Sequence, residues 1–195
     1  MSRVVGLTGG VASGKSHVLH LFHALGVPTI EADDVGRAVV APGQPALTEI
    51  ANTFGAHLLL ADGSLDRRAL RAVVFADATA LKRLEAITHP HIFASLRQWL
   101  AAQTAPYCLL SAAILLESGM VALTERVLVV DAPEADQISR LVHRDQIDGT
   151  LARQMLARQA SRAERLAAAH DVIDNPDPLQ DLKPQVLALH ARYSV

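Results

Sequence analysis

The sequence has very little cysteine and no excess of charge of either sign. Cys108 is the single cysteine in 195 residues, so no internal disulfide can form and the chain suits a reducing compartment. Its place in the run Cys108-Leu109-Leu110 predicts a small buried hydrophobe rather than a reactive thiol. The 18 Lys and Arg residues nearly balance the 20 Asp and Glu residues, which argues against a general nucleic-acid-binding protein.

Long apolar runs are also missing. No stretch approaches the ~18 uncharged apolar residues that a membrane-spanning helix needs. Glycines at positions 6, 9 and 10 interrupt the apolar segment near the N-terminus and Lys15 follows at once, so we do not expect a signal peptide. These absences predict a cytoplasmic protein with neither a membrane nor a nucleic-acid partner.

Half of the residues are hydrophobic, which is enough for the core of one compact domain. Short, nearly continuous apolar runs alternate with longer helical patterns, as is typical of parallel strands that are buried on both faces. We therefore predict an α/β fold, with a mainly parallel five-stranded sheet between two layers of helices. The predicted strands are Arg3–Leu7, Pro28–Ile30, Tyr107–Ser111, Val127–Asp131 and Val172–Asp174.

Two segments interrupt this alternation. Residues 38–103 form a long, mostly helical insertion, with turns at Pro42-Gly43-Gln44-Pro45 and Ala61-Asp62-Gly63-Ser64. The pattern of residues 137–166 predicts an Arg-rich pair of helices, with a break at Asp148-Gly149. The remaining segments, 1–37, 104–136 and 167–195, are expected to form the core of a single domain spanning 1–195.

The motif that decides the function class is a phosphate-binding loop. Gly9-Gly10-Val11-Ala12-Ser13-Gly14-Lys15-Ser16 matches the pattern G-x-x-x-x-G-K-[ST], between a predicted strand and a predicted helix. Glycines allow the tight turn that presents backbone N–H groups to phosphate oxygens, and the helix N-terminus adds positive potential. We expect Lys15 to reach the β- and γ-phosphates and the Ser16 hydroxyl to bind Mg²⁺. The predicted ATP contacts within the loop are Gly10, Val11, Ala12, Ser13, Gly14, Lys15 and Ser16.

Other residues indicate a kinase rather than a GTPase. The Asn-Lys-x-Asp run that binds guanine is absent, and the D-x-x-G match at Asp33-Asp34-Val35-Gly36 comes too early for a third strand. If Pro28–Ile30 runs parallel to the first strand, the loop after it emerges at the same sheet edge as the phosphate loop. There Asp33 could accept the proton of an attacking hydroxyl, and Arg37 could hold an anionic acceptor.

At this point the sequence resembles a known family. Glu31-Ala32-Asp33-x-x-x-Arg37 is similar to the D-A-D-x-x-x-R segment of dephospho-coenzyme A (dephospho-CoA) kinases, and further short matches follow in the family's order along nearly the whole chain. They are Pro42-Gly43, Phe54-Gly55, Asp62-Gly63-x-Leu65-x-Arg67, Leu84-Glu85-x-Ile87-Thr88-His89-Pro90, Gln137-x-x-Arg140-Leu141-x-x-Arg144, Gln159 and Asp171-Val172-Ile173-Asp174-Asn175.

The resemblance implies transfer of the γ-phosphoryl group of ATP to the ribose 3′-hydroxyl of dephospho-CoA, the last step of coenzyme A synthesis, with Mg²⁺ as cofactor. It implies that 38–103 binds the acceptor and that 137–166 is a lid. Asn175 would lie near the adenine and Asp33 would be the general base. The acceptor-side assignments are Thr8, Asp33, Arg37 and His89.

The lid residues Arg140 and Arg144 are spaced i, i+4, so both could meet phosphate oxygens when the lid closes. We assign Arg140 a catalytic role beside Lys15 and Asp33, and Arg144 a role in ATP binding. The more scattered arginines of the lid, from Arg153 to Arg165, are expected to lie on a solvated helix face.

Two positions depart from the family pattern. Ser111 stands where the family usually has an acidic residue, which predicts a weaker hold on Mg²⁺, and Glu31 replaces an aspartate. Two alternatives therefore stay open: another P-loop small-molecule kinase, and a catalytically silent nucleotide-binding regulator, which Ser111 favours. We expect ATP and dephospho-CoA as partners, in a monomer or a weak homo-oligomer.

Overall fold

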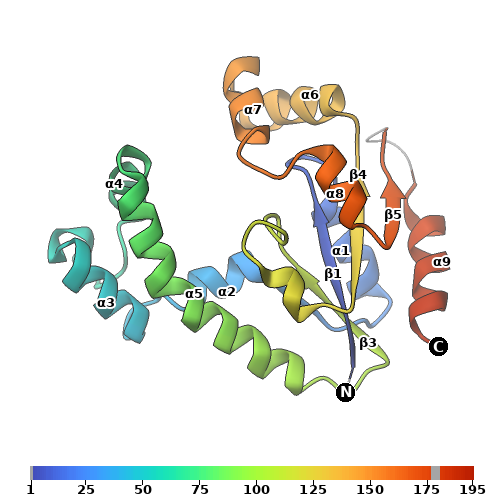
Figure 1. The fold of residues 1–195 in the computed structure, drawn as a ribbon, viewed down its shortest axis with the longest axis horizontal. Coiled ribbons are helices and arrows are strands. Elements are labelled where there is room, and N and C mark those ends of the chain that lie inside the picture. The colour runs from blue at the N-terminus through green and yellow to red at the C-terminus, as the bar shows by residue number, and fades with distance from the viewer. Residues whose placement is uncertain (1, 177–180) are drawn as a thin grey trace. The chain divides into compact units, whose positions relative to one another are not determined.

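The computed structural model describes residues 2–176 and 181–195 (Figure 1). The chain divides into two compact units. Met1–Glu31 and Leu100–Val195 form one of them, called here the sheet unit. Ala32–Trp99 form the other, called here the helical unit. Each is described by itself.

The sheet unit contains five strands in the order β2-β3-β1-β4-β5, and every neighbouring pair is parallel. This confirms the predicted sheet. The strand that ends at Ser111 lies beside the strand that leads into the phosphate loop. All four pairings are parallel, so the prediction of a mainly parallel sheet was cautious. The strands are β1 Arg3–Gly9, β2 Thr29–Glu31, β3 Tyr107–Ser111, β4 Arg126–Asp131 and β5 Asp171–Asp174.

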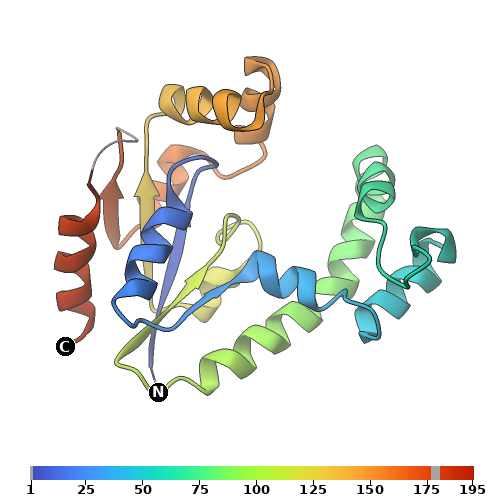
Figure 2. The same ribbon diagram turned by 180° about the vertical axis from the view of Figure 1, so that it is seen from behind.

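Helices cover both faces of this sheet. On one face α1 (Lys15–Ala24) and α9 (Lys183–Tyr193) lie side by side and bury Phe22 and Tyr193 against the strands (Figure 2). On the other face lie α8 (Arg162–Ala168) and the short helix η2 (Met120–Leu123). Cys108 is fully buried in β3, as expected, and burial raises the pKa of its thiol to about 11.

The predicted lid segment contains α6 (Glu134–Asp145) and α7 (Gly149–Leu156). The break between them falls where it was predicted, because the Asp148 side chain accepts hydrogen bonds from the first backbone N–H groups of α7. The prediction of only two helices was incomplete. Ser161 and Glu164 form a capping box that starts the separate helix α8.

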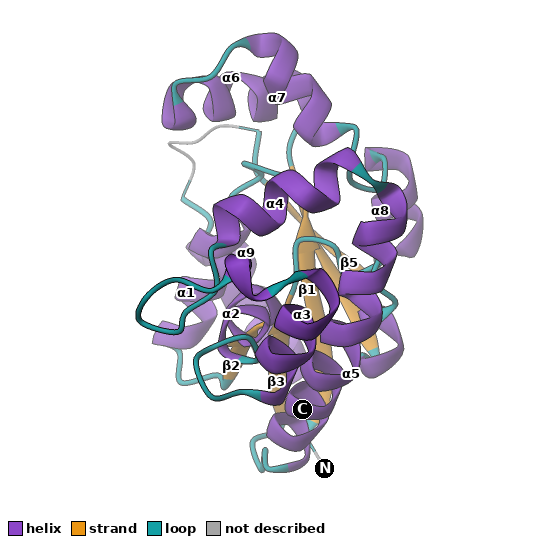
Figure 3. Ribbon diagram, turned by 90° about the vertical axis from the view of Figure 1, so that its left-hand side faces the viewer, coloured by secondary structure: helices purple, strands orange, loops and turns teal. Residues whose placement is uncertain are grey.

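The helical unit is built from helices joined by loops and turns (Figure 3). Its elements are α2 (Ala32–Ala38), α3 (Pro45–Phe54), η1 (Ala56–Leu58), α4 (Arg67–Ala76) and most of α5 (Ala78–Ala101). Buried aliphatic residues such as Ile50 and Leu58 form a core separate from that of the sheet unit. Within the described ranges, no helix is long and apolar enough to cross a membrane.

Candidate active site

The phosphate loop joins β1 to α1 and depends on two glycines. Gly14 has φ +100°, and a Cβ there would lie 2.4 Å from Nδ2 of Asn175. A Cβ on Gly10 would lie 2.1 Å from Oε1 of Gln137, a buried residue of α6. Neither position has room for a side chain, so the loop backbone packs directly against side chains from distant segments.

Lys15, the first residue of α1, is held at the carboxyl ends of two strands. Its Nζ donates to the Ser111 hydroxyl at 2.7 Å and lies 3.8 Å from Oε2 of Glu31. The sheet register explains this arrangement, because Ser111 pairs with Glu31 on one side and with Leu7 on the other. Ser111 therefore has a partner that the sequence did not indicate: the loop lysine itself.

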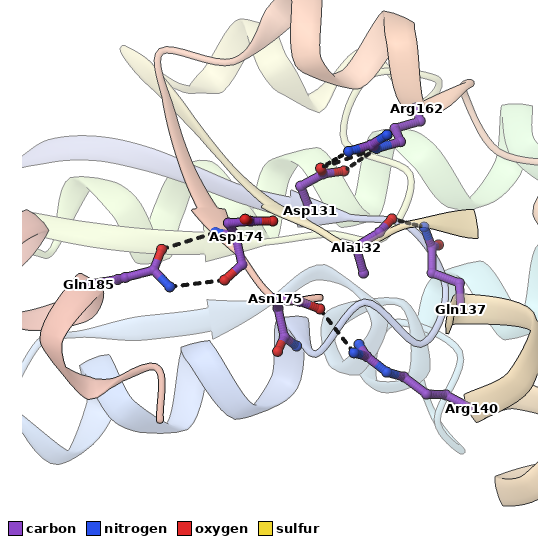
Figure 4. Close-up of polar contacts among 8 residues, drawn as sticks. All are labelled: Asp131, Ala132, Gln137, Arg140, Arg162, Asp174, Asn175 and Gln185. Atoms are coloured by element: carbon purple, nitrogen blue, oxygen red, sulfur yellow. Dashed lines mark hydrogen bonds and ion pairs between the residues drawn. The ribbon is translucent and has the colours of Figure 1, made fainter. Parts of the chain in front are cut away.

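Asn175 and Arg140 fix the far side of the loop (Figure 4). The Asn175 side chain donates from Nδ2 to the backbone oxygen of Ser13 at 2.7 Å. Arg140 donates to the backbone oxygens of Asn175 at 2.9 Å and Ala12 at 3.4 Å. Both residues thus contact the phosphate loop, and both do so through backbone carbonyls.

Arg144 behaves differently from Arg140. Its guanidinium pairs with the neighbouring Asp145 at 2.7 Å, and its side chain is 60% exposed. The i, i+4 spacing on α6 therefore does not bring the two guanidinium groups together on the loop in this structure.

Gln159 is a loop contact whose role the sequence did not indicate. Its Oε1 accepts from the backbone N–H of Val11 at 2.8 Å, and its Nε2 donates to the backbone oxygen of Ala113 at 3.1 Å. The next peptide is also held, because Ala160 donates its N–H to the Glu117 carboxylate. The segment that leads out of α7 is thereby fastened to the loop; Gln159 appeared in the sequence only as an isolated family match.

The expectation that the scattered lid arginines lie on a solvated face was wrong for Arg165 and incomplete for Arg162. Arg165 is only 7% exposed and lies next to Gly10, and burial lowers the pKa of its guanidinium. Arg162 pairs with the buried Asp131 at the end of β4, with a shortest distance of 2.6 Å (Figure 4). The positions of both side chains depend on tertiary packing, and no local sequence pattern predicts them.

The remaining predicted residues of the sheet unit are Ser16 and Thr8. Ser16 is exposed in the first turn of α1. Thr8 is 1% exposed inside β1, one residue before the loop begins.

The predicted acceptor residues Asp33, Arg37 and His89 belong to the helical unit. Asp33 and Arg37 lie on α2 rather than on a loop, because the helix begins directly after β2. Both are exposed, and Arg37 pairs with Asp34. His89 is half-buried in α5, with its ring centroid 6.3 Å from that of Phe93.

With this geometry established, comparison with known proteins identifies the family. Residues 3–181 match the family described as dephospho-CoA kinase. The chain belongs to the dephospho-CoA kinase family. It is 49% identical to a dephospho-CoA kinase of Methylococcus capsulatus over 98% of this chain and 97% of the relative. It is 47% identical to one of Aeromonas hydrophila over 97% and 94%.

Solved structures agree. A dephospho-CoA kinase from Campylobacter jejuni superposes with a TM-score of 0.75 at 26% identity, over 100% of this chain and 98% of that one. The structure of TT1252 from Thermus thermophilus gives 0.85 at 29% identity, over 98% and 97%. A shikimate kinase from Bacteroides thetaiotaomicron, at 0.54 and 12% identity over 99% of both chains, shares the fold alone. The chain is therefore an ATP-dependent kinase of the dephospho-CoA kinase family, which decides between the alternatives left by the sequence.

Proposed function

We propose that the chain transfers the γ-phosphoryl group of ATP to the ribose 3′-hydroxyl of dephospho-CoA, giving coenzyme A and ADP. The observation that carries the proposal is a phosphate loop whose backbone is fixed by side chains from several segments. Gln159, Asn175 and Arg140 each bond to a loop peptide group. Phosphoryl transfer depends mainly on positioning and charge stabilisation, and a phosphate loop whose backbone is held in one conformation serves both.

On the nucleotide side, the loop N–H groups would bind the phosphates and Lys15 would exchange Ser111 for a phosphate oxygen. The residues present fit Mg²⁺: Ser16 offers a hydroxyl oxygen, and Mg²⁺ takes its other ligands from phosphates and water. When bound with ATP, the ion would neutralise the charge that develops on the β- and γ-phosphates. In the described part of the chain no cluster of three or more His, Cys, Asp or Glu could hold a metal alone. The ion would therefore arrive with the nucleotide.

On the acceptor side, Asp33 is the proposed general base. The 3′-oxygen would attack the γ-phosphorus, the bond to the β–γ bridging oxygen would break, and the hydroxyl proton would pass to the Asp33 carboxylate. The exposed carboxylate is free to approach a substrate hydroxyl. Arg37 and His89 would bind the acceptor's charged and polar groups, and Arg140 and Arg144 would bind the nucleotide phosphates on closure.

The sharpest test is product analysis by mass spectrometry after incubation with ATP, Mg²⁺ and a panel of acceptors. Dephospho-CoA should gain one phosphoryl group, and coenzyme A, which already carries the 3′-phosphate, should gain none. A Lys15→Ala preparation, purified identically, controls for contaminating kinases. Phosphorylation of shikimate, gluconate or AMP with dephospho-CoA unchanged would refute the proposal.

We also propose a cytoplasmic enzyme that acts as a monomer or a weak homo-oligomer. The single buried cysteine supports a reducing compartment. Sedimentation velocity over a range of protein concentrations tests the assembly state. A stable tetramer at nanomolar concentration would contradict it.

A further inference from the structure

Arg165 of α8 is a buried cation that no step of the proposed reaction yet uses. Its side chain is only 7% exposed, and the ion pairs of the described residues do not include its guanidinium. Its Nη1 donates to the backbone oxygen of Ala160, which satisfies a donor but does not neutralise the charge. Arginine stays charged in proteins, and a buried charge is costly unless another group compensates for it.

The acidic side chains that attract Arg165 at longer range have other partners or are exposed. Asp131, at the end of β4, accepts from Nε and Nη2 of Arg162 at 2.9 and 2.6 Å (Figure 4). The Glu117 carboxylate accepts from a backbone N–H in the segment before α8. Glu134 is exposed, where water and salt screen its charge. The charge of Arg165 is therefore left without a direct partner among the described residues.

The Arg165 guanidinium lies against the phosphate loop at Gly10. The point that a Cβ on Gly10 would occupy is 2.8 Å from Nη2 of Arg165, so the guanidinium can approach only because this residue has no side chain. Arg165 thus places a positive charge beside the loop backbone. At a buried position the field of this charge is weakened less than it would be in water.

Gln137 of α6 approaches the same point from a different helix. Its Oε1 lies 2.1 Å from the Cβ position on Gly10. Its Nε2 donates to the backbone oxygen of Ala132 at 2.7 Å, which fixes the orientation of the amide (Figure 4). Gln137 is 1% exposed, and its Oε1 has no hydrogen-bond partner among the described residues. A glutamate of the same size would place a carboxylate near Arg165, whereas the neutral amide leaves the charge of Arg165 to act on the loop.

We propose that Arg165 is a positioning residue of the kinase reaction: it gives the phosphate loop a fixed positive charge that favours the ATP phosphates, and the neutral Gln137 preserves that charge. No contact between Arg165 and a phosphate is required, because charges inside a protein still interact over roughly 10 Å. Bound phosphates would supply the negative charge that the buried guanidinium lacks. The inference concerns the nucleotide alone and does not depend on the identity of the acceptor.

The first test separates the charge of Arg165 from its size. Arg165→Met keeps a long side chain without the charge, and Arg165→Lys keeps the charge. Calorimetry measures the Kd of inorganic tripolyphosphate and of ATP. Arg165→Met should raise both Kd values by about tenfold, the effect of one unit charge on another over roughly 10 Å in a protein, and Arg165→Lys should stay within about threefold of the parent.

Arg126→Met is the matched control. Arg126 pairs with Asp171 at 3.1 Å at the amino end of β4, and the phosphate loop follows the carboxyl end of the parallel strand β1. Its loss should lower thermal stability but leave the Kd of tripolyphosphate unchanged. If Arg165→Lys and Arg165→Met weaken binding equally, or if neither does, Arg165 only fills space and the inference is overturned.

Gln137 provides a second test, which decides alone if circular dichroism shows that Arg165→Met is not folded. Gln137→Glu and Gln137→Met both lose the bond to Ala132, but only the glutamate brings a carboxylate near Arg165. Gln137→Glu should bind tripolyphosphate about tenfold more weakly than Gln137→Met, although its new ion pair should make it the more stable variant in thermal unfolding.

The two readings of the second test are opposed in sign, which a role in packing alone would not produce. Equal binding of tripolyphosphate by Gln137→Glu and Gln137→Met would overturn the inference. Weaker binding by a Gln137→Glu variant that is also the less stable of the two would show direct repulsion by an unpaired carboxylate, and it would overturn the inference as well. Neither result bears on whether dephospho-CoA is the acceptor, so the proposed function stands or falls separately.

Discussion

The phosphate loop of the sheet unit and the predicted acceptor residues of the helical unit are held in opposite ways. Side chains from outside the loop bond to its peptide groups at Val11, Ala12 and Ser13. Asp33 and Arg37 are exposed on α2, and the only side-chain partner of Arg37 among the described residues is Asp34. One site is built before its ligand arrives, whereas the other presents exposed side chains on a helix surface.

The difference follows from what each site has to recognise. Backbone N–H groups bind phosphate only when several peptides point to one place, so the loop must be rigid in advance. A general base needs one free carboxylate, and the acceptor itself supplies the rest of the geometry. Substitutions around the loop should therefore act mainly on nucleotide binding, and substitutions on α2 should act on turnover or on acceptor binding.

The substitution with the largest expected effect lies in the helical unit. Asp33→Asn keeps the size and polarity of the side chain but removes the base, so kcat should fall by about 10²–10⁴-fold. ATP affinity, measured by calorimetry, should not change, because the loop is intact. If the variant turns over like the parent, then the base is another group or positioning alone suffices.

Lys15→Ala tests the sheet unit, where a substitution should weaken nucleotide binding. Loss of this phosphate-facing charge should lower kcat/KM for ATP by about 10²–10³-fold and also weaken ATP binding. The measurement pairs calorimetric titration of ATP with steady-state kinetics. A variant with normal ATP affinity and reduced turnover would show that Lys15 acts on the transition state alone.

Gln159→Ala, with a smaller expected effect, tests whether the loop conformation is fixed before ATP binds. Gln159→Ala removes the acceptor for the Val11 N–H, and the KM for ATP should rise by about tenfold or less. The matched control is Gln185→Ala, since Gln185 also accepts from one backbone N–H and donates to one backbone oxygen, both of Asp174, at 3.0 and 2.9 Å (Figure 4).

Both variants should lose a similar amount of thermal stability, about 1 kcal/mol, but only the first should change the KM for ATP. Equal effects on that KM would show that Gln159 contributes to stability and not to the geometry of the loop.

The sequence predicted the features that local chemistry controls. Short apolar runs between helical patterns predicted all five strands of the sheet, and the spacing of Gly9, Gly14 and Lys15 predicted the phosphate loop. Both features depend on residues that are close together in the sequence. The same is true of the turn before Pro45, which starts α3.

The sequence did not predict two of the distant side chains that contact the loop. Gln159 lies 148 residues from Val11, and Arg165 reaches Gly10 through the packing of α8 on β4. Such contacts follow from the tertiary fold and leave no periodic pattern. Asp33 was placed on a loop for a related reason: α2 begins directly after β2, with no turn residue to mark the boundary.

The substitution with the smallest expected effect is Ser111→Asp. The family usually has an acidic residue at this strand end, and serine lacks the charge that would attract Mg²⁺ or a water bound to it. We therefore expect an active enzyme in which Ser111→Asp lowers the Mg²⁺ midpoint a few-fold at fixed ATP. The structure adds a competitor for the new carboxylate, because Lys15 Nζ already lies 2.7 Å from the Ser111 hydroxyl.

A magnesium titration at several ATP concentrations separates the two partners. If the carboxylate acts on the ion, the Mg²⁺ midpoint falls and the KM for ATP stays constant. If it instead forms an ion pair with Lys15, the midpoint is unchanged and the KM for ATP rises, because the lysine must leave a stronger partner to reach the phosphates. The second result would contradict the prediction. It would show that Ser111 keeps Lys15 available for the nucleotide, with Ser16 and the phosphates alone fixing the metal.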